Sequence, residues 1–102
     1  MTYTLDDYTV VATQAIKHQN LDVLCYLLQF NLDTQNLITV AVENNSTQVI
    51  EYFMDKGLID NVNNYSCLAL KYRHGDLIKY FINKGASKFW LSMYDAMRKL
   101  NL

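Results

Sequence analysis

The chain has 102 residues, of which 51% are hydrophobic and 19% charged, and its net charge is −1 at neutral pH. This length fits a single domain over residues 1–102, and the composition argues against a disordered chain. The near-neutral charge argues against nucleic acid or an anionic membrane as the partner, and no apolar run is long enough to span a bilayer. The first ten residues hold two Asp and no basic residue, so we expect no secretory signal and a cytoplasmic location.

A seventeen-residue block occurs three times along the chain. The copies occupy residues 15–31, 41–57 and 69–85, which places their starts 26 and 28 residues apart. Each copy opens with Ala and carries Tyr at its twelfth position. Self-similarity at such a period is typical of stacked repeat arrays. These arrays present a surface to a partner rather than enclose a reaction centre.

The apolar spacing within each copy predicts two helices separated by a polar break. The first helix has apolar residues at helical spacing, as at Leu37, Ile38 and Ala41. The second has them at i, i+1, i+4 and i+5, which predicts one broad buried stripe. The three stripes are Val23, Leu24, Leu27 and Leu28, then Val49, Ile50, Phe53 and Met54, then Leu77, Ile78, Phe81 and Ile82.

Each second helix is followed by a residue suited to left-handed backbone. Gly57 and Gly85 close the second and third copies. Asn31 is expected to do the same in the first copy, because Asn tolerates that conformation better than most residues.

The segment 90–100 predicts one more helix. Its Ala96 lies 27 residues beyond Ala69, at the same phase as the earlier block starts. We read this segment as the first helix of a fourth copy, which gives seven helices in an all-α fold.

Two segments resemble the ankyrin repeat. They are residues 20–28 (NLDVLCYLL) and 74–86 (HGDLIKYFINKGA), with an acidic residue before the apolar pair and, in the second, a closing Gly-Ala. The resemblance implies an ankyrin-like helical solenoid of about three and a half helix-turn-helix repeats. The repeats would occupy roughly residues 8–33, 34–61, 62–87 and, for the half repeat, 88–102.

The chain departs from the ankyrin pattern in two ways. The family's Thr-Pro-Leu-His tetrapeptide is absent, and the family period of about 33 residues is shortened. Because the seventeen-residue block keeps its length, the connectors must be shorter, so we expect tight β-turn loops at residues 32–35 and 58–63. Such shortened arrays occur in large DNA viruses and in some intracellular bacteria and protists, so a viral protein in the host cytoplasm is one expectation.

The resemblance implies a partner-binding surface on the concave face of the first helices. The residues placed there are Lys17, His18, Glu43, Asn44, Lys71 and Tyr72. Their mixed character suits a protein partner, a host protein if the source is viral, better than nucleic acid or lipid. Simple solubility is the alternative reading of the same residues.

The last helix suggests a second hypothesis. Because the fourth copy lacks its second helix, Trp90, Met93 and Met97 could stay uncovered and pair two chains as a weak homodimer rather than a monomer. The alternative is that Phe89, Trp90 and Tyr94 simply seal the end of the last full repeat. They could also form an interaction hot spot.

The repeated Tyr26, Tyr52 and Tyr80 are read as half-buried residues of the second helices, with a binding ladder as the alternative.

No constellation of reactive residues stands out. Cys25 and Cys67 have no metal-like spacing and are expected to be reduced thiols, with a disulfide or metal role as the alternative. His18 and His74 occupy different block positions. A phosphate-binding turn is the alternative reading of the triplet Arg73, His74 and Gly75. We therefore expect a protein-interaction module that is not an enzyme and needs no metal or cofactor. An enzyme that uses His74 or Cys67 is the third hypothesis.

Overall fold

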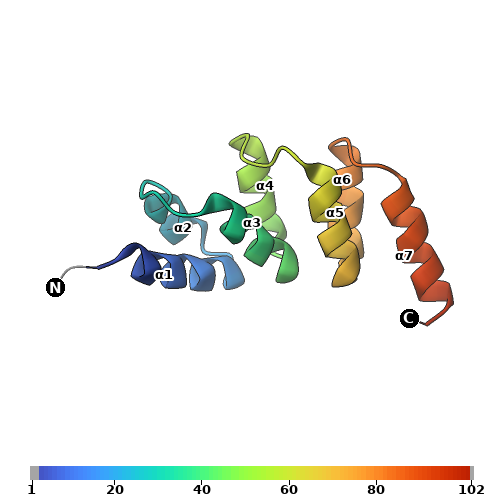
Figure 1. Ribbon diagram of the computed structural model, residues 1–102, viewed down its shortest axis with the longest axis horizontal. Coiled ribbons are helices and arrows are strands. Elements are labelled where there is room, and N and C mark those ends of the chain that lie inside the picture. The colour runs from blue at the N-terminus through green and yellow to red at the C-terminus, as the bar shows by residue number, and fades with distance from the viewer. Residues whose placement is uncertain (1–2, 102) are drawn as a thin grey trace. The chain divides into compact units, whose positions relative to one another are not determined.

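A computed structural model of the chain describes residues 3–101, and within that range all regular structure is helical. The helices are α1 (Leu5–Lys17), α2 (Leu21–Leu27), α3 (Thr34–Glu43), α4 (Thr47–Asp55), α5 (Val62–Lys71), α6 (Gly75–Asn83) and α7 (Phe89–Lys99) (Figure 1). Residues 3–101 thus confirm the prediction of seven helices and an all-α fold. The helices form two compact units, Met1–Leu58 (unit 1) with α1 to α4 and Ile59–Leu102 (unit 2) with α5 to α7.

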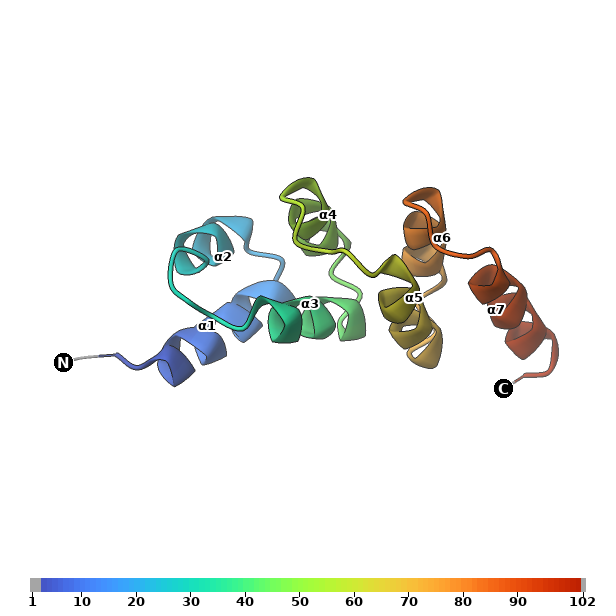
Figure 2. The ribbon, with the colours of Figure 1, turned by 45° about the horizontal axis from the view of Figure 1, so that its top comes forward.

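In unit 1, α1 packs against both α2 and α3, and α3 packs against α4 (Figure 2). The buried apolar side chains come from all four helices and one connector. They are Ala12, Ala15, Ile16, Leu24, Leu27, Leu32, Leu37, Ile38, Ala41, Val42, Val49, Ile50 and Phe53. The small Ala residues that open the blocks lie in this core, where they allow neighbouring helices to approach closely.

The first copy leaves one face uncovered. Val11 and Val23 are exposed, whereas Leu37 and Val49, which occupy the same places one copy later, are completely buried. Helix α1 of the first copy packs against α3 of the second copy. No helix of unit 1 packs in the same way against the other side of α1. The predicted burial of Val23 is therefore wrong, because burial here depends on a neighbouring copy.

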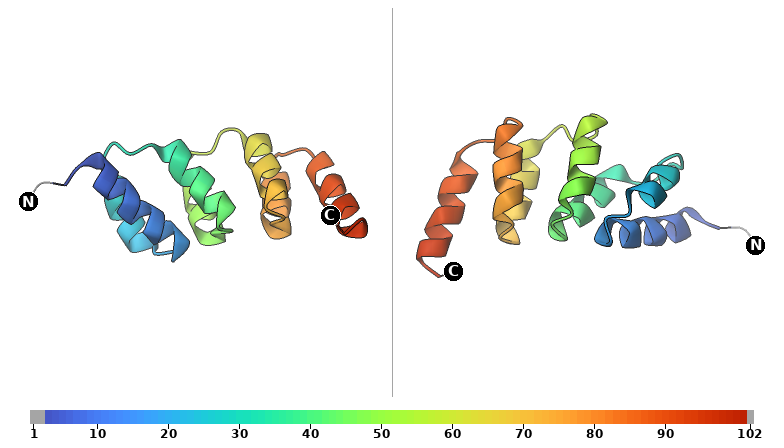
Figure 3. Two further views of the ribbon diagram at one scale, coloured as in Figure 1. Left: turned by 60° about the horizontal axis from the view of Figure 1, so that its bottom comes forward. Right: turned by 180° about the vertical axis from the view of Figure 1, so that it is seen from behind.

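In unit 2, α5 and α6 form a tight pair and α7 packs against both (Figure 3). The fully buried apolar side chains of the pair are Ala69, Leu77, Ile78 and Phe81. Ser66 is also buried, and its Oγ donates to the carbonyl of Val62 at 2.7 Å.

Helix α7 is held by polar contacts and by one close aromatic contact. The Oδ1 atom of Asn63 in α5 accepts from the Ser87 N–H at 2.9 Å and from the Trp90 Nε1–H at 3.0 Å. The ring of Tyr94 lies so close to Gly75 that a Cβ on residue 75 would sit 2.7 Å from it. No residue of α7 is fully buried, and Ala96 is exposed, unlike the buried Ala residues of the three blocks.

The three turns within the copies share one backbone geometry. Each turn holds a non-glycine residue in the left-handed region and returns an N–H to the carbonyl of the Ala that opens the block, as in a Schellman motif. The left-handed residues are Gln19 (φ 52°), Asn45 (φ 53°) and Arg73 (φ 61°). The N–H groups of Asn20, Ser46 and His74 donate to the carbonyls of Ala15, Ala41 and Ala69 at 2.8, 2.9 and 2.9 Å.

The second helices end as predicted in two copies of three. Gly57 and Gly85 have φ of 71° and 113°, so their left-handed backbone is confirmed. The prediction for Asn31 is wrong, since Asn31 is not among the described residues with positive φ. Here α2 stops early at Leu27, and the Phe30 N–H closes a tight turn on the carbonyl of Leu27 at 3.1 Å.

The connectors between copies are shorter than the predicted loops. Helix α3 begins within the predicted loop 32–35 and α5 within the predicted loop 58–63. Asp33 and Asn61 start these helices by accepting the N–H groups of Asn36 and Asn64, both at 3.2 Å. Such side-chain caps satisfy N–H groups that a helix leaves unpaired at its start.

Two long-range hydrogen bonds join the turn of the first copy to the turn of the second. Ser46 precedes α4 but does not cap it, and instead its Oγ donates to the carbonyl of Ile16 in α1 at 2.9 Å. The start of α4 is capped by Gln19, whose Oε1 accepts the Gln48 N–H at 3.2 Å. Ser46 is only 2% exposed, so its hydroxyl is a buried polar link between the two copies.

Replacing Ser46 by Ala is expected to lower the free energy of unfolding by about 1 kcal/mol, because a buried hydrogen bond is lost while Ile16 keeps the N–H of Gln19 as a second donor. Urea denaturation of the purified chain measures this change. The matched control is Ser92→Ala on the exposed face of α7, expected to stay within about 0.5 kcal/mol of wild type. If both substitutions lowered the free energy of unfolding equally, the hydrogen bond from Ser46 to Ile16 would not stabilise the fold.

Gly75→Ala tests the contact between α6 and α7. In the wild-type background the added methyl meets the Tyr94 ring, and we expect a net loss of about 1 kcal/mol from overpacking. In a Tyr94→Ala background the same change should instead stabilise the chain by about 0.5–1 kcal/mol, because Ala is the better helix former. Thermal unfolding of the wild type, the two single variants and the double variant measures the effect of Gly75→Ala in each background. A stabilising effect of Gly75→Ala in the wild-type background would refute the contact.

Candidate interaction surface

The six residues predicted to bind a partner all lie where a first helix ends. Lys17, Glu43 and Lys71 are the last residues of α1, α3 and α5, and His18, Asn44 and Tyr72 are the C-caps that follow them. Glu43 is half-buried and the other five are exposed. The repeated turn geometry therefore presents an equivalent pair of side chains from each copy.

The six residues belong to both compact units. Four of them belong to α1 and α3, which pack together in unit 1, and Lys71 and Tyr72 belong to unit 2. Lys17 and Lys71 complement the partial negative charge at a helix C-terminus. The side chain of Asn44 turns back on its own helix, since its Nδ2 donates to the carbonyl of Val40 at 2.8 Å.

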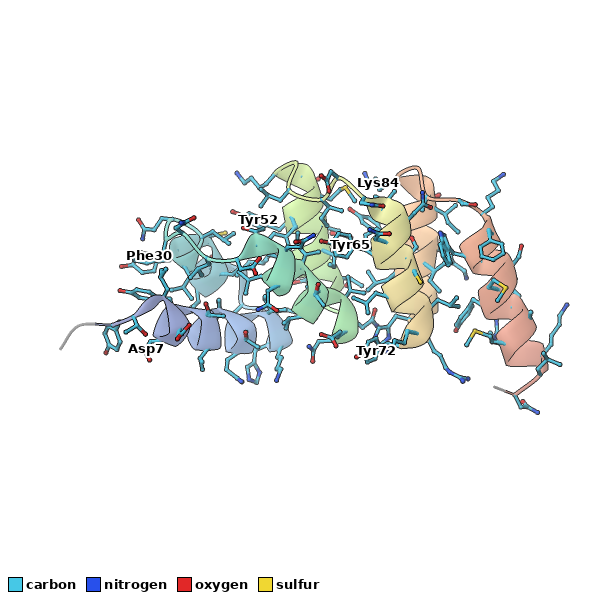
Figure 4. All side chains as sticks on the ribbon, in the orientation of Figure 1. Asp7, Phe30, Tyr52, Tyr65, Tyr72 and Lys84 are labelled. Atoms are coloured by element: carbon cyan, nitrogen blue, oxygen red, sulfur yellow. The ribbon has the colours of Figure 1, made fainter. Side chains whose placement is uncertain are left out.

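Tyr72 is the most distinctive member of this set. It lies at the end of α5 (Figure 4) and is 41% exposed. The Nζ of Lys71 lies 5.8 Å from its ring centroid, and the His74 ring stacks on it at 6.2 Å with an interplanar angle of 13°. Contacts with neighbouring side chains restrict an exposed aromatic ring before it binds, so less conformational freedom is lost on binding, as expected of an interaction anchor. The sequence analysis did not connect His74 with Tyr72, although the spacing of two residues across a turn could have suggested it.

The repeated Tyr residues of the second helices differ between the copies. Tyr52 and Tyr80 are half-buried as predicted, whereas Tyr26 is 63% exposed, so the prediction is wrong for the first copy. Lys56 and Lys84 lie one helical turn after Tyr52 and Tyr80, and each Nζ is 5.6 Å from the ring centroid. In the first copy Phe30 occupies the place of the Lys and stacks on Tyr8 at 4.3 Å (Figure 4). Cation–π contacts of this kind therefore occur on the second helices of the second and third copies only, within the described residues.

The Tyr52 hydroxyl has a partner in α2. A side-chain hydrogen bond with Cys25, together with the loss of solvent around the ring, raises the pKa of Tyr52 above its ordinary value. Cys25 of α2 is thus the neighbour that most affects the titration of Tyr52 in α4.

The cysteines and the other possible metal ligands form no metal-binding cluster in the part of the chain that the structure describes. Cys25 and Cys67 are exposed free thiols in different units. Over residues 3–101 no group of three or more His, Cys, Asp and Glu is arranged to hold a metal ion. None of the described helices is both long and apolar enough to cross a membrane.

The three residues proposed for self-association do not share one free face. Trp90 is half-buried and bonded to Asn63, and Met97 is half-buried. Met93 lies instead on an exposed stripe of α7 that the sequence analysis missed. The stripe consists of Phe89 (56% exposed), Met93 (38% exposed), Ala96 and Leu100 (67% exposed).

Comparison with known proteins gives one partial similarity. The chain is similar to the arginine ADP-riboxanase OspC1 of Shigella flexneri, with 31% identity over 94 aligned residues that take in 72% of this chain and 20% of that protein. The chain thus spans about a fifth of the length of this relative. No protein-family profile matches the chain, and no solved structure matches it.

This similarity corrects one prediction. The relative is by its name an enzyme, which contradicts the expectation that the present protein is not one. That expectation was inferred from the repeated helix pattern. A fold does not determine which reaction a longer protein with a similar segment catalyses.

The hydrogen bond between Cys25 and Tyr52 can be tested by titration. Because the pKa of folded Tyr52 is raised, the stability it contributes is complete below the ordinary Tyr value of about 10 and is lost as the pH rises through the folded value. Cys25→Ala should move the pKa of Tyr52 back toward the ordinary value, as followed by NMR of ¹³Cζ-labelled Tyr. Cys67→Ala is the control, and an identical titration of Tyr52 in both variants would contradict the bond.

Proposed function

We propose that this chain is a protein-binding segment built from shortened ankyrin-like repeats. The support is the equivalence of its three turns, each with a left-handed residue and an N–H returned to the Ala that opens the block. The packing of α3 on α1 within unit 1 is of the kind that stacks one repeat on the next.

The proposed binding surface consists of the ends of α1, α3 and α5. Each end presents the last helical residue and its C-cap, and the side chains at these two positions differ between the copies. They are Lys17 and His18, Glu43 and Asn44, and Lys71 and Tyr72. A constant backbone that carries variable side chains suits recognition of one particular protein surface. The observation that carries the proposal most directly is the exposed Tyr72, whose ring has Lys71 and His74 as close neighbours.

The partial relative suggests a setting for this binding. Its name describes an enzyme that acts on arginine, and the present chain aligns with about a fifth of it. We propose that a segment of this kind holds the protein whose arginine such an enzyme modifies.

The proposal predicts that changes at the end of α5 weaken partner binding. Tyr72→Ala removes the proposed anchor and Lys71→Glu reverses the charge beside it, and each should raise the Kd for an isolated partner at least tenfold, which corresponds to about 1.4 kcal/mol. The partner is captured with the immobilised wild-type chain and then titrated by calorimetry. Lys79→Glu, an equal charge change on the exposed face of α6, is the matched control. Unchanged affinity in both test variants would refute the proposed surface.

A further inference from the structure

The tyrosine at the twelfth place of each block has a different neighbour in the first copy. In the second and third copies a Lys four residues later lies over the ring of Tyr52 or Tyr80, with its Nζ 5.6 Å from the centroid. In the first copy the residue four places after Tyr26 is Phe30. Within residues 3–101 no cation lies over the Tyr26 ring, which is 63% exposed. The first copy therefore offers a tyrosine ring that in the other two copies already contacts a cation.

Phe30 places a second aromatic ring beside Tyr26. Helix α2 ends at Leu27, so Phe30 lies in the turn that follows the helix (Figure 4). Its ring stacks on Tyr8 of α1 with the centroids 4.3 Å apart and an interplanar angle of 7°. The same ring meets the Tyr26 ring at 5.8 Å with an interplanar angle of 73°. The stack on Tyr8 thus fixes an aromatic neighbour for Tyr26, which restricts the exposed ring before it binds anything.

A carboxylate lies one helical turn before Tyr26. Asp22 and Tyr26 are both exposed residues of α2, and their spacing of four residues makes the two side chains neighbours on the helix surface. Asp76 and Tyr80 have the same spacing in the third copy, where Lys84 completes a row of carboxylate, ring and cation. The first copy repeats the carboxylate and the ring but has no cation at the third place.

The charge around this ring favours a cation from another molecule. Unit 1 carries seven Asp and Glu against two Lys, so these side chains give it a net charge of −5. Between Lys17 and Lys56 the sequence has five Asp and Glu and neither Lys nor Arg. Of these two lysines, Lys56 already lies over Tyr52 and Lys17 ends α1. A negative field of this kind attracts a basic segment of a partner.

We propose that Tyr26, Phe30 and Asp22 form a site for a cationic side chain, arginine or lysine, from a basic segment of a protein partner. The cation would lie over the Tyr26 ring, and the Asp22 carboxylate would accept its N–H groups. A single cation–π contact on an exposed ring is weak, so neighbouring residues of the segment must add to it, which favours a protein over a free small cation. The site goes beyond the binding surface proposed above, because it uses the second helix of the first copy and not the ends of the first helices.

NMR titration of the whole chain with three short peptides tests this site. The probes are acetyl-Gly-Arg-Gly-Arg-Gly-amide, the same peptide with Lys for Arg, and the same peptide with citrulline, which has the shape of arginine without its charge. We expect saturable shifts of the Tyr26 and Phe30 ring signals with the Arg or the Lys peptide, and the stronger of the two identifies the preferred cation. The citrulline peptide should bind about fivefold more weakly. Equal binding of the citrulline peptide, or no saturable shift with either charged peptide, overturns the proposal.

Substitutions within the site separate the ring from the rest of the helix. Tyr26→Leu and Asp22→Asn should each raise the Kd of the preferred peptide about three- to fivefold, whereas Tyr26→Phe keeps the ring face and should bind like wild type. Phe30→Lys should also weaken binding, because it gives the first copy the cation that the other copies have. The test does not depend on Phe30→Lys, which removes the stack on Tyr8, since Tyr26 and Asp22 are exposed.

Two matched controls complete the experiment. Asp76→Asn removes the carboxylate at the same place of the third copy, where Lys84 already contacts the ring of Tyr80, and should leave the Kd unchanged. Tyr72→Ala removes the anchor of the binding surface proposed above and should also leave it unchanged, so failure of that surface and failure of this site are distinguishable. Controls as damaging as Tyr26→Leu, or equal affinity of Tyr26→Leu and wild type, overturn the proposal.

Discussion

The two hydrogen bonds that the second copy donates to the first are the constraint on which unit 1 depends. Helices of this length are marginal alone, so each must be stabilised by its neighbours. Ser46 gives up the capping of its own helix to bond the carbonyl of Ile16, and Gln19 supplies the missing cap to Gln48. The two copies are therefore completed by each other, in addition to the apolar contacts that any two helices could make.

The same turns determine which side chains the chain offers to a partner. Because each turn needs a left-handed residue and an N–H returned to a buried Ala, the last helical residue and its C-cap are fixed in position. Their chemistry is free to vary, as the pairs Lys17–His18 and Glu43–Asn44 show.

The sequence predicts the local features of this fold well. The number of helices and the left-handed Gly57 and Gly85 follow from periodicity and backbone preference, both of which act over a few residues. The role of Asn31 was mispredicted because α2 ends early in a tighter turn, and the exposure of Val23 depends on a neighbouring copy. The long-range partners of Ser46 and Trp90 could not be predicted either, since each lies about one copy away in the chain. The repeat pattern likewise predicts the arrangement of helices but not whether a related protein is an enzyme.

Native-state hydrogen exchange in unit 1 tests the interlock of the copies most directly. If the copies complete each other, the amides of α2 and α4 should exchange through one common opening with the same free energy, and the Gln48 amide should be as protected as the core of α4. Protection of α1 and α2 that persists while α4 opens independently at lower free energy, with a fast-exchanging Gln48 amide, would contradict this account.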